Sequence, residues 1–110
     1  MSETYRKEIL QNIIRNQLDV QLLRIVQMQP TWGYKIKKQV DAEFNVKLRH
    51  SALYPALKAL EGKGFLESTS QQKGGRALKV YAITENGKAY LQVYYSILQG
   101  QLESGNSKPN

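Results

Sequence analysis

Residues 49–64 read RHSALYPALKALEGKG, and this stretch decides the fold. Leu53, Leu57 and Leu60 recur in it at spacings of four and three, which at about 100° per residue places them on one face of a helix. That face is expected to lie against the core. Ser51 precedes it as the expected N-cap. The expected stop signals are two glycines, Gly62 and Gly64.

The opposite face of this helix carries mostly small side chains. Its members are Ser51, Ala52, Pro55, Lys58, Ala59 and Gly62. Pro55 is expected in the first turn, where it forfeits at most one hydrogen bond. Small residues with basic groups at the rim let a helix approach another surface closely, and the major groove of DNA, about 12 Å wide, is such a surface. The alternative is an ordinary packed helix whose outer face happens to be small.

The composition excludes several classes of function. The 110 residues suffice for one domain with a modest core. The chain has no cysteine and a single histidine, His50, so disulfides, zinc ligation and Ser/Cys-His catalysis lack their parts. The nine carboxylates show no spacing typical of a glycosidase pair or an oxygen-ligand metal loop. We therefore expect neither an enzyme nor a bound metal or cofactor.

Charge and hydropathy predict the partners and the compartment. A net charge of +7 and a pI near 9.7 favour binding to polyanions, with an affinity that weakens in salt. No apolar run approaches the roughly 20 residues of a membrane span, and the N-terminus is polar, without a signal-peptide core. The sequence therefore predicts a soluble, cytoplasmic protein.

The apolar face of residues 5–29 changes sides along the chain. The first half carries one apolar side, made of Tyr5, Ile9, Ile13 and Ile14. The second half carries a nearly opposite side, made of Leu18, Leu22, Ile25 and Val26. Either the helix is interrupted near residue 16, where Asn16 or Asp19 could cap it, or one continuous helix serves two surfaces. In both cases the second half belongs to the core and the first half needs another partner.

A short helix is expected after Pro30, with Thr31 as its cap. Its apolar stripe is Ile36, Val40 and Phe44. Two aromatic residues are expected to pack at its start, Trp32 and Tyr34. Lys35 and Lys38 project to the other side, either into solvent or toward phosphates. With a turn at Asn45, this helix and residues 51–62 form a helix-turn-helix, whose second helix reads the DNA groove.

After the second of these helices the period of the apolar residues changes from 3.6 to 2. Two strands are expected, within residues 65–70 and 78–83. Gly74 and Gly75 between them favour a hairpin turn with positive φ. Positive charge flanks this turn, at Lys73 and Arg76. The loop lacks the spacing of a nucleotide-binding P-loop. It is either a flexible exposed hairpin or a wing laid along a nucleic-acid backbone or minor groove, and the small-faced helix before it favours the wing.

The last helix is expected to start at a Thr84 cap, with Glu85 at its positive end. It has two apolar seams, one made of Leu91, Tyr95, Leu98 and Leu102 and the other of Gly87, Tyr90, Tyr94 and Ile97. A two-fold dimer, in which one seam meets Ile9 and Ile13 of a second copy, is favoured. Alternatively the unpaired apolar face of the first helix and that of the last helix cover each other within one chain. A frayed tail is expected from Gly100, with residues 104–110 disordered.

Three motifs resemble those of the PadR family of transcriptional regulators. Residues 30–36, PTWGYKI, are similar to its P-x-x-G-Y-x-I opening, and residues 51–61, SALYPALKALE, are similar to its recognition helix. Gly74-Gly75-Arg76, with residues 79–81 and 83–87, is similar to its wing and to the start of its last helix. The resemblance runs from about residue 18 to 98, and the combination of motifs is highly specific.

The resemblance implies a winged helix-turn-helix domain, mainly α with a small β-hairpin, over residues 1–103, with N- and C-terminal dimerisation helices. It implies a homodimeric regulator, most often a repressor, on a palindromic operator in double-stranded DNA. The residues expected to contact DNA are Tyr34, Lys35, Arg49, His50, Ser51, Ala52, Tyr54, Lys58, Lys73, Gly74, Gly75, Arg76 and Lys79. The expected dimer interface is Tyr5, Ile9, Ile13, Tyr90, Leu91, Tyr94, Tyr95 and Leu98. Lys35 departs from the family, which often has Glu there, and adds charge to the DNA side.

A single C-terminal helix is typical of the short subfamily, whose known effectors sit at the dimer interface. Tyr90, Tyr94 and Tyr95 are therefore either the lining of a small-molecule site or plain interface packing. The alternative function is a winged-helix protein-interaction module without sequence-specific DNA binding, whose small-residue face fits a protein groove.

Overall fold

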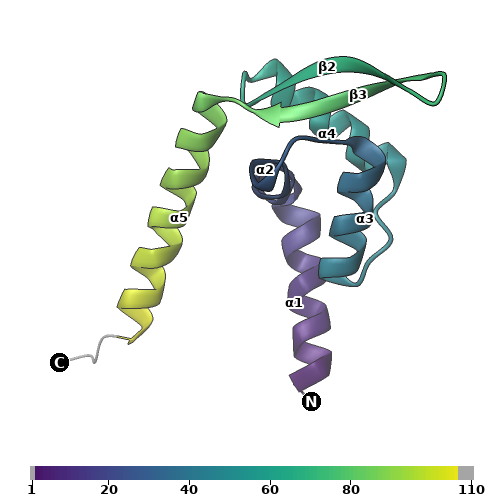
Figure 1. Cartoon of the computed structure of the whole chain (residues 1–110). Helices are drawn as coiled ribbons and strands as arrows, with labels where there is room; N and C mark the ends of the chain where they lie inside the picture. The colour runs from purple at the N-terminus through teal and green to yellow at the C-terminus, as the bar shows by residue number, and fades with distance from the viewer. Residues whose placement is uncertain (1, 107–110) are drawn as a thin grey trace.

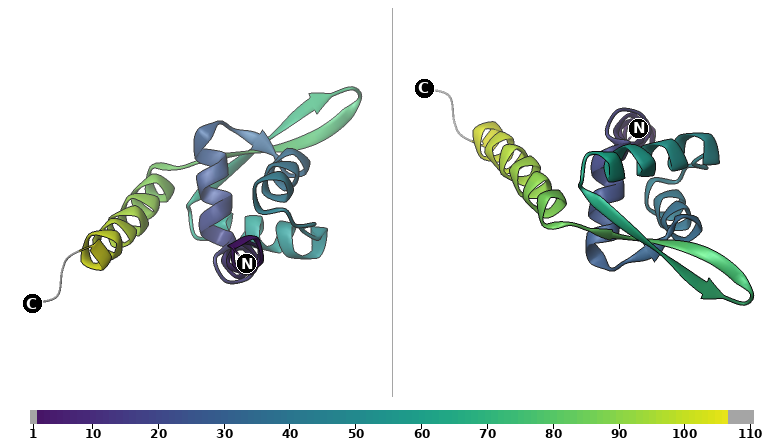
Figure 2. Two further views of the ribbon diagram at one scale, coloured as in Figure 1. Left: turned by 90° about the horizontal axis from the view of Figure 1, so that it is seen from below. Right: turned by 90° about the horizontal axis from the view of Figure 1, so that it is seen from above.

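The computed structural model describes residues 2–106 and is mainly helical, with a small antiparallel sheet, as predicted (Figure 1). Its elements are α1 (Ser2–Asn16), α2 (Leu18–Met28), β1 (Thr31–Trp32), α3 (Gly33–Phe44), α4 (His50–Gly62), β2 (Leu66–Lys73), β3 (Arg76–Ile83) and α5 (Glu85–Asn106). The β2–β3 hairpin projects beyond the helices, and α5 leaves the body on the other side (Figures 1 and 2). This order of elements is that of a winged helix-turn-helix.

The core lies where α2, α3 and α4 meet under the sheet, and the apolar stripes predicted from the sequence form it. Its fully buried side chains include Leu22, Leu23, Val26, Ile36, Val40, Leu53, Leu57, Leu60, Leu66 and Leu91. Burying a leucine or isoleucine side chain contributes about 1.5–3 kcal/mol each relative to leaving it in water. The three helices are therefore fixed against one another by their shared apolar contacts, and α4 is held with its other faces turned outward.

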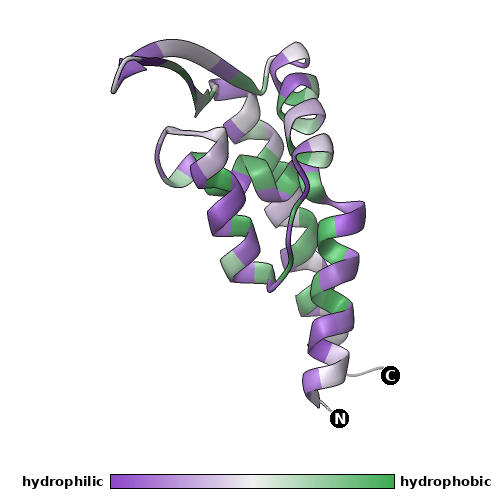
Figure 3. Ribbon diagram, turned by 90° about the vertical axis from the view of Figure 1, so that its right-hand side faces the viewer, coloured by the Kyte–Doolittle hydropathy of each residue, from purple (hydrophilic) through white to green (hydrophobic). Residues whose placement is uncertain are grey.

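The phase change in the N-terminal segment is a break at Gln17, which confirms the first of the two alternatives. Gln17 ends α1 by donating its N–H to the Ile13 carbonyl (2.7 Å), and its φ and ψ of −132° and 34° are not helical. Asp19 then accepts a hydrogen bond from the N–H of Val20 (2.8 Å) in the first turn of α2. No side chain between Ser2 and Asn16 is buried. Hydrophilic and hydrophobic positions alternate along α1, whose N-terminal end stands clear of the other helices (Figure 3).

The helix starts differ from the sequence predictions at two caps. Thr31 lies in β1, not at the N-cap of α3, and its hydroxyl is buried without a partner among the described residues. Arg49, not Ser51, is the N-cap of α4, and it makes no capping bond through its side chain. Pro55 therefore falls in the second turn rather than the first. The helical hydrogen bond that it forfeits is the one to the carbonyl of Ser51, on the exposed side where water can replace it.

The sheet has three strands in the order β1-β3-β2, one more than the predicted hairpin. Thr31 pairs with Tyr81, so the residues before α3 add a short edge strand to the wing. Strands β2 and β3 extend to Lys73 and Arg76, which face each other across a two-residue turn. The turn glycines have φ of 59° and 77°, the positive values that the Gly-Gly pair predicted. The hairpin is thus longer than expected, and its charged tip stands away from the core.

Thr84 caps α5 as predicted. Its hydroxyl accepts a hydrogen bond from the N–H of Gly87 (3.1 Å) and donates one to the carbonyl of Gly64 (2.5 Å), which ties the helix start to the end of α4. The prediction of a frayed tail from Gly100 is wrong over residues 100–106, where α5 continues, because a helix already formed adds residues at little cost even when they are polar or glycine. Positions 107–110 of the predicted tail lie outside the described residues.

Candidate nucleic-acid interface

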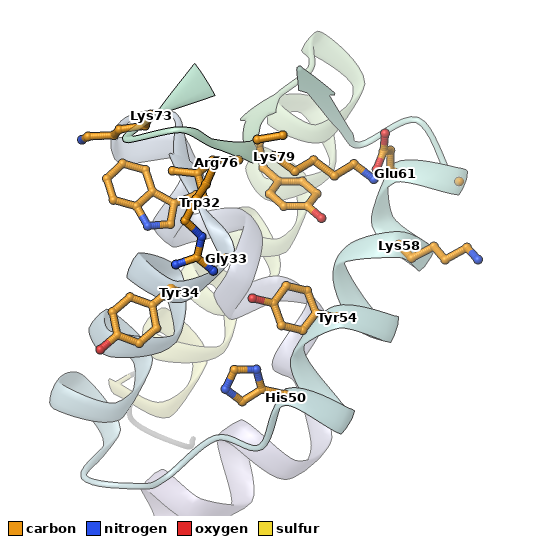
Figure 4. Close-up of a pocket in the computed structure, with 14 residues that line it drawn as sticks. Trp32, Gly33, Tyr34, His50, Tyr54, Lys58, Glu61, Lys73, Arg76 and Lys79 are labelled. Atoms are coloured by element: carbon orange, nitrogen blue, oxygen red, sulfur yellow. Dashed lines mark ion pairs between the residues drawn. The ribbon is translucent and has the colours of Figure 1, made fainter. Parts of the chain in front are cut away.

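A cleft of about 1290 Å³ lies between α4 and the basic face of the wing. The α4–wing cleft is lined by Trp32, Gly33, Tyr34, His50, Tyr54, Lys58, Glu61, Gly62, Lys73, Arg76, Ala77, Leu78, Lys79 and Tyr81 (Figure 4). Small-molecule pockets are usually about 300–1,000 Å³ and mostly apolar. This cleft is larger, open and ringed by cations, which are the properties of a surface for a polyanion.

The exposed part of α4 has a narrow crest between two flanks. Ser51, Pro55 and Ala59 lie on the crest, opposite the buried leucines, and all three are exposed. His50, Tyr54, Lys58 and Glu61 form the flank toward the cleft. Ala52 lies about 200° from Tyr54, on the other flank. The crest therefore presents backbone and small side chains, as the sequence predicted, and any surface that meets it can come close to the helix.

Gly33 allows α3 to start directly against α4. A Cβ at this position would lie 2.7 Å from Cε1 and 2.9 Å from the hydroxyl of Tyr54. The Tyr54 ring points toward Gly33 (Figure 4), is 40% exposed and lies 5.6 Å from the ring of His50. The glycine of the P-x-x-G-Y motif thus has a physical role, because a larger residue would displace this aromatic side chain from the floor of the cleft.

Trp32 holds two of the predicted DNA-contacting lysines. The ammonium group of Lys73 lies 4.7 Å from the centroid of the indole ring and that of Lys35 lies 5.4 Å from it. Cation–π contacts of this kind are worth about 0.5–1 kcal/mol at exposed sites. Sequence reasoning treated Trp32 as a packing residue at the start of α3 and missed this role. The one available signal was the lone tryptophan beside a cluster of lysines.

Glu61 links the recognition helix to the wing. Ser68 on β2 donates a hydrogen bond to its Oε2 (2.7 Å), and the ammonium group of Lys79 on β3 lies 3.4 Å from its Oε1. The Ser68 hydroxyl, helped by Lys79, lowers the pKa of Glu61 below its usual 4.5. Burial of the Tyr81 ring beside this pair raises the pKa of its hydroxyl. Lys79 is consequently engaged by a carboxylate, and its charge is partly neutralised within the chain.

The turn between α3 and α4 is held by Asp41. Burial alone would raise the pKa of Asp41, but the N–H of Leu48 donates to Oδ1 (2.7 Å) and Lys37 donates to Oδ2 (2.6 Å), and together they lower it below its usual 3.8. Asn45 takes the left-handed conformation at the end of α3, with φ 53° and ψ 51°, as the sequence predicted for the turn. These contacts fix the direction in which α4 leaves the turn.

The structure brings together seven of the predicted DNA-contacting residues around the α4–wing cleft: Tyr34, His50, Tyr54, Lys58, Lys73, Arg76 and Lys79. Arg76 points into the cleft, whereas Lys58 points outward (Figure 4). Gly74 and Gly75 form the tip of the hairpin. Arg49 and Ala52 lie on the other side of α4, where they line a second hollow.

The predicted dimer interface is split between exposed and buried positions. Leu91 is fully buried in the core and is not available to a second chain. Tyr5 and Ile9 on α1 are 56% and 57% exposed, and Leu98 on α5 is 37% exposed. The others are Ile13, Tyr90, Tyr94 and Tyr95, which are half-buried or exposed at the inner ends of the same helices. Packing of the two surplus faces against each other within one chain is not observed, because α1 and α5 diverge (Figures 1 and 2).

A helix-turn-helix followed by a basic β-hairpin defines the chain as a winged helix-turn-helix protein. Residues 22–93 match the model of the transcriptional regulator PadR-like family, and the chain belongs to this family. Members of the family are transcription regulators rather than enzymes. No helix within residues 2–106 is long and apolar enough to cross a membrane.

Three similar proteins illustrate the relationship. A protein of Lysinibacillus sphaericus, described only as uncharacterized protein X, is 32% identical over 83 residues, which cover 73% of this chain and 76% of that protein. A PadR family transcription regulator from Clostridium difficile R20291 is 28% identical, with a TM-score of 0.72 over 80% of this chain and 93% of its own. The protein TA0346 from Thermoplasma acidophilum is 27% identical, with a TM-score of 0.73 over 84% of this chain and 89% of its own.

Proposed function

We propose that this protein is a homodimeric, sequence-specific DNA-binding repressor that acts in the cytoplasm on a palindromic operator. The observation that carries the proposal is the small, exposed crest of α4 beside the α4–wing cleft. An α-helix with side chains is about 10–12 Å across, close to the width of the major groove, so a crest without bulky side chains allows α4 to reach base edges. Ser51 and Lys58 on this helix are the proposed reading residues.

The wing supplies the proposed contacts to the DNA backbone. Arg76 and Lys73 flank the hairpin turn, and Tyr34, 54% exposed, lies at the start of α3 on the same side. Contacts of this kind position a protein on the duplex without reading its sequence. Lys35 and Lys38 are exposed as well, but they lie over the rings of Trp32 and Tyr34, at 5.4 and 5.3 Å, and would add charge rather than selectivity.

A second copy of the chain is the proposed cover for the open faces of α1 and α5. On α5, Val93, Ile97 and Leu102 are 62%, 57% and 62% exposed, and Ile9 on α1 is 57% exposed, so both helices carry apolar side chains that a partner could cover. For two copies of α4 to enter successive major grooves, two-fold pairing through these helices must place them about 34–36 Å apart. A small apolar effector would enter this interface at the hollow of about 460 Å³ lined by Phe65, Tyr90, Tyr94 and neighbouring residues of α5.

Titration with DNA tests the proposal. Wild-type protein is titrated with a palindromic duplex from upstream of its own gene and with a scrambled duplex of equal length, at several salt concentrations. We expect a preference for the palindrome and an affinity that falls with salt. Arg76→Ala should weaken both duplexes alike, whereas Ser51→Ala or Lys58→Ala should change the preference between them.

Each of four results would contradict part of the proposal. Equal affinity for the two duplexes would rule out sequence-specific recognition. If the α4 variants and the wing variant each lose the same affinity for both duplexes, α4 is not the reading helix. Stoichiometric binding of a protein partner without any DNA binding would favour the interaction module instead. Sedimentation of the free protein as a monomer at the concentrations of the titration would remove the homodimer.

A further inference from the structure

A second hollow lies on the flank of α4 that faces away from the wing. The α1–α4 hollow has a volume of about 720 Å³ and is lined by Gln11, Ile14, Arg15, Val46, Lys47, Leu48, Arg49 and Ala52. It is built from the end of α1, the segment before α4 and the second flank of α4. Among these residues, sequence reasoning assigned a role in DNA contact only to Arg49 and Ala52.

Three cations line this hollow and form no ion pair within residues 2–106. Arg15, Lys47 and Arg49 are all exposed, and none of them forms an ion pair with a carboxylate of the described chain. The acid that lies near Lys47 is Asp41, whose two oxygens already accept hydrogen bonds from Lys37 and Leu48. The hollow therefore carries a local excess of positive charge, which Asp41 offsets only in part.

These cations lie on the side of α4 opposite the wing, and this position indicates what they would bind. Ala52 borders the hollow and Tyr54 borders the α4–wing cleft, and at 100° per residue they lie about 200° apart around the helix. A helix in the major groove lies between two phosphate backbones, because the groove is only about as wide as the helix. The wing cations lie on one side of α4, and Arg15, Lys47 and Arg49 lie on the other.

We propose that the α1–α4 hollow binds the phosphate backbone of the DNA strand opposite the one that the wing contacts. Arg15, Lys47 and Arg49 supply the charge, and Arg15 gives α1 a direct part in DNA binding besides its proposed part in the dimer. This inference rests on the proposed function, but it concerns backbone contacts only. It can be tested on a duplex of any sequence, so it does not depend on the identity of an operator.

The test replaces single cations with glutamine and measures the salt dependence of binding. Arg15→Gln and Lys47→Gln are compared with Arg6→Gln, which removes the same charge from the exposed N-terminal part of α1, remote from the hollow. Each lost phosphate contact reduces the slope of log affinity against log salt by about 0.9. In a homodimer each substitution removes two contacts, so between 50 and 200 mM salt wild-type affinity should fall about 12-fold more than that of either hollow variant. The affinity of Arg6→Gln should fall by the same factor as that of the wild type.

Ethylation interference locates the contacts. Within each half-site, Arg15→Gln should remove interference at phosphates of one strand, and Arg76→Ala in the wing should remove it at phosphates of the other. If Arg15→Gln and Lys47→Gln keep the wild-type slope while Arg76→Ala reduces it, DNA binding stands and this inference is wrong. If wild-type protein binds duplex but shows no preference among sequences, the proposed function fails, whereas reduced slopes for the hollow variants would still support this inference. If wild-type protein binds no duplex, both fail.

Discussion

Replacing Gly87 by alanine should destabilise the protein, although alanine is the better helix former. A Cβ at this position would lie 2.2 Å from the carbonyl oxygen of Phe65 and 2.7 Å from Cγ1 of Ile83. Ordinary contact begins near 3.4 Å, so the backbone of Phe65 and the first turn of α5 must separate by about 1.2 Å (3.4 minus 2.2). The Phe65 carbonyl accepts a hydrogen bond from the N–H of Thr84 (3.1 Å), and the Thr84 hydroxyl caps the same turn. The separation would weaken both bonds.

The expected size of this effect follows from three contributions. Overpacking costs about 1–3 kcal/mol, and weakening a cap costs about 1 kcal/mol. The helix gains about 0.5–1 kcal/mol from replacing glycine by alanine. We expect the free energy of unfolding to fall by about 2 kcal/mol, and Tm by about 8–16 °C for a domain of this size.

Urea and thermal unfolding, followed by far-UV circular dichroism at one fixed protein concentration, measure this difference. The matched control is Gly100→Ala in the same helix, where an added Cβ would have no atom within 4 Å. It should leave stability unchanged or raise it by up to about 1 kcal/mol. If Gly87→Ala unfolds at or above the wild-type midpoint, the close packing of α5 on Phe65 does not constrain this position and the reasoning is refuted.

Three further predictions concern the turn, the cleft and the wing. The pKa of Asp41 is lowered, so its carboxylate stabilises the fold above pH 4, and this stabilisation is lost as pH falls below 3.8. Asp41→Asn should therefore reduce the free energy of unfolding by about 1 kcal/mol at pH 7 and by progressively less in acid. Urea midpoints at pH 7 and pH 3 measure this difference. Gly33→Ala should rotate the flexible Tyr54 ring out of the cleft. Its urea midpoint should stay near that of the wild type while its affinity for duplex DNA falls, and an unchanged affinity would contradict this prediction. Gly75→Ala, at φ 77°, should destabilise the hairpin turn by about 1–2 kcal/mol. Amide exchange should become faster at the hairpin tip only, and exchange that becomes faster uniformly across the core would contradict this prediction.

Features of the fold that depend on neighbouring residues were predictable from the sequence. The leucines of α4, the phase change at Gln17, the Thr84 cap and the Gly-Gly turn each leave a signal within a few residues of chain. Features that depend on contacts between distant residues were not. Strand β1 is only two residues long and exists because Thr31 pairs with Tyr81, far along the chain. That pairing also takes Thr31 away from the cap of α3.

The candidate site was likewise predictable only in part from the sequence. The cations around the α4–wing cleft and the small crest of α4 could be listed from composition and helical spacing. Partners of individual side chains could not, because they lie on different elements. Lys79 has the same charge as Lys73 in the sequence, yet one faces Glu61 and the other Trp32. The hollow beside Arg15 depends on the angle between α1 and α4, which no local pattern encodes.

Trp32 is the only tryptophan of the chain, and it lies under two lysines at the edge of the cleft. Its emission depends on the electric field at the indole, which changes when either ammonium group moves toward a phosphate. The protein thus contains an intrinsic fluorescent reporter at its proposed contact surface. Occupancy of the wing could be followed in real time without any added label, and dimer formation at the remote α1 and α5 faces would leave the signal unchanged.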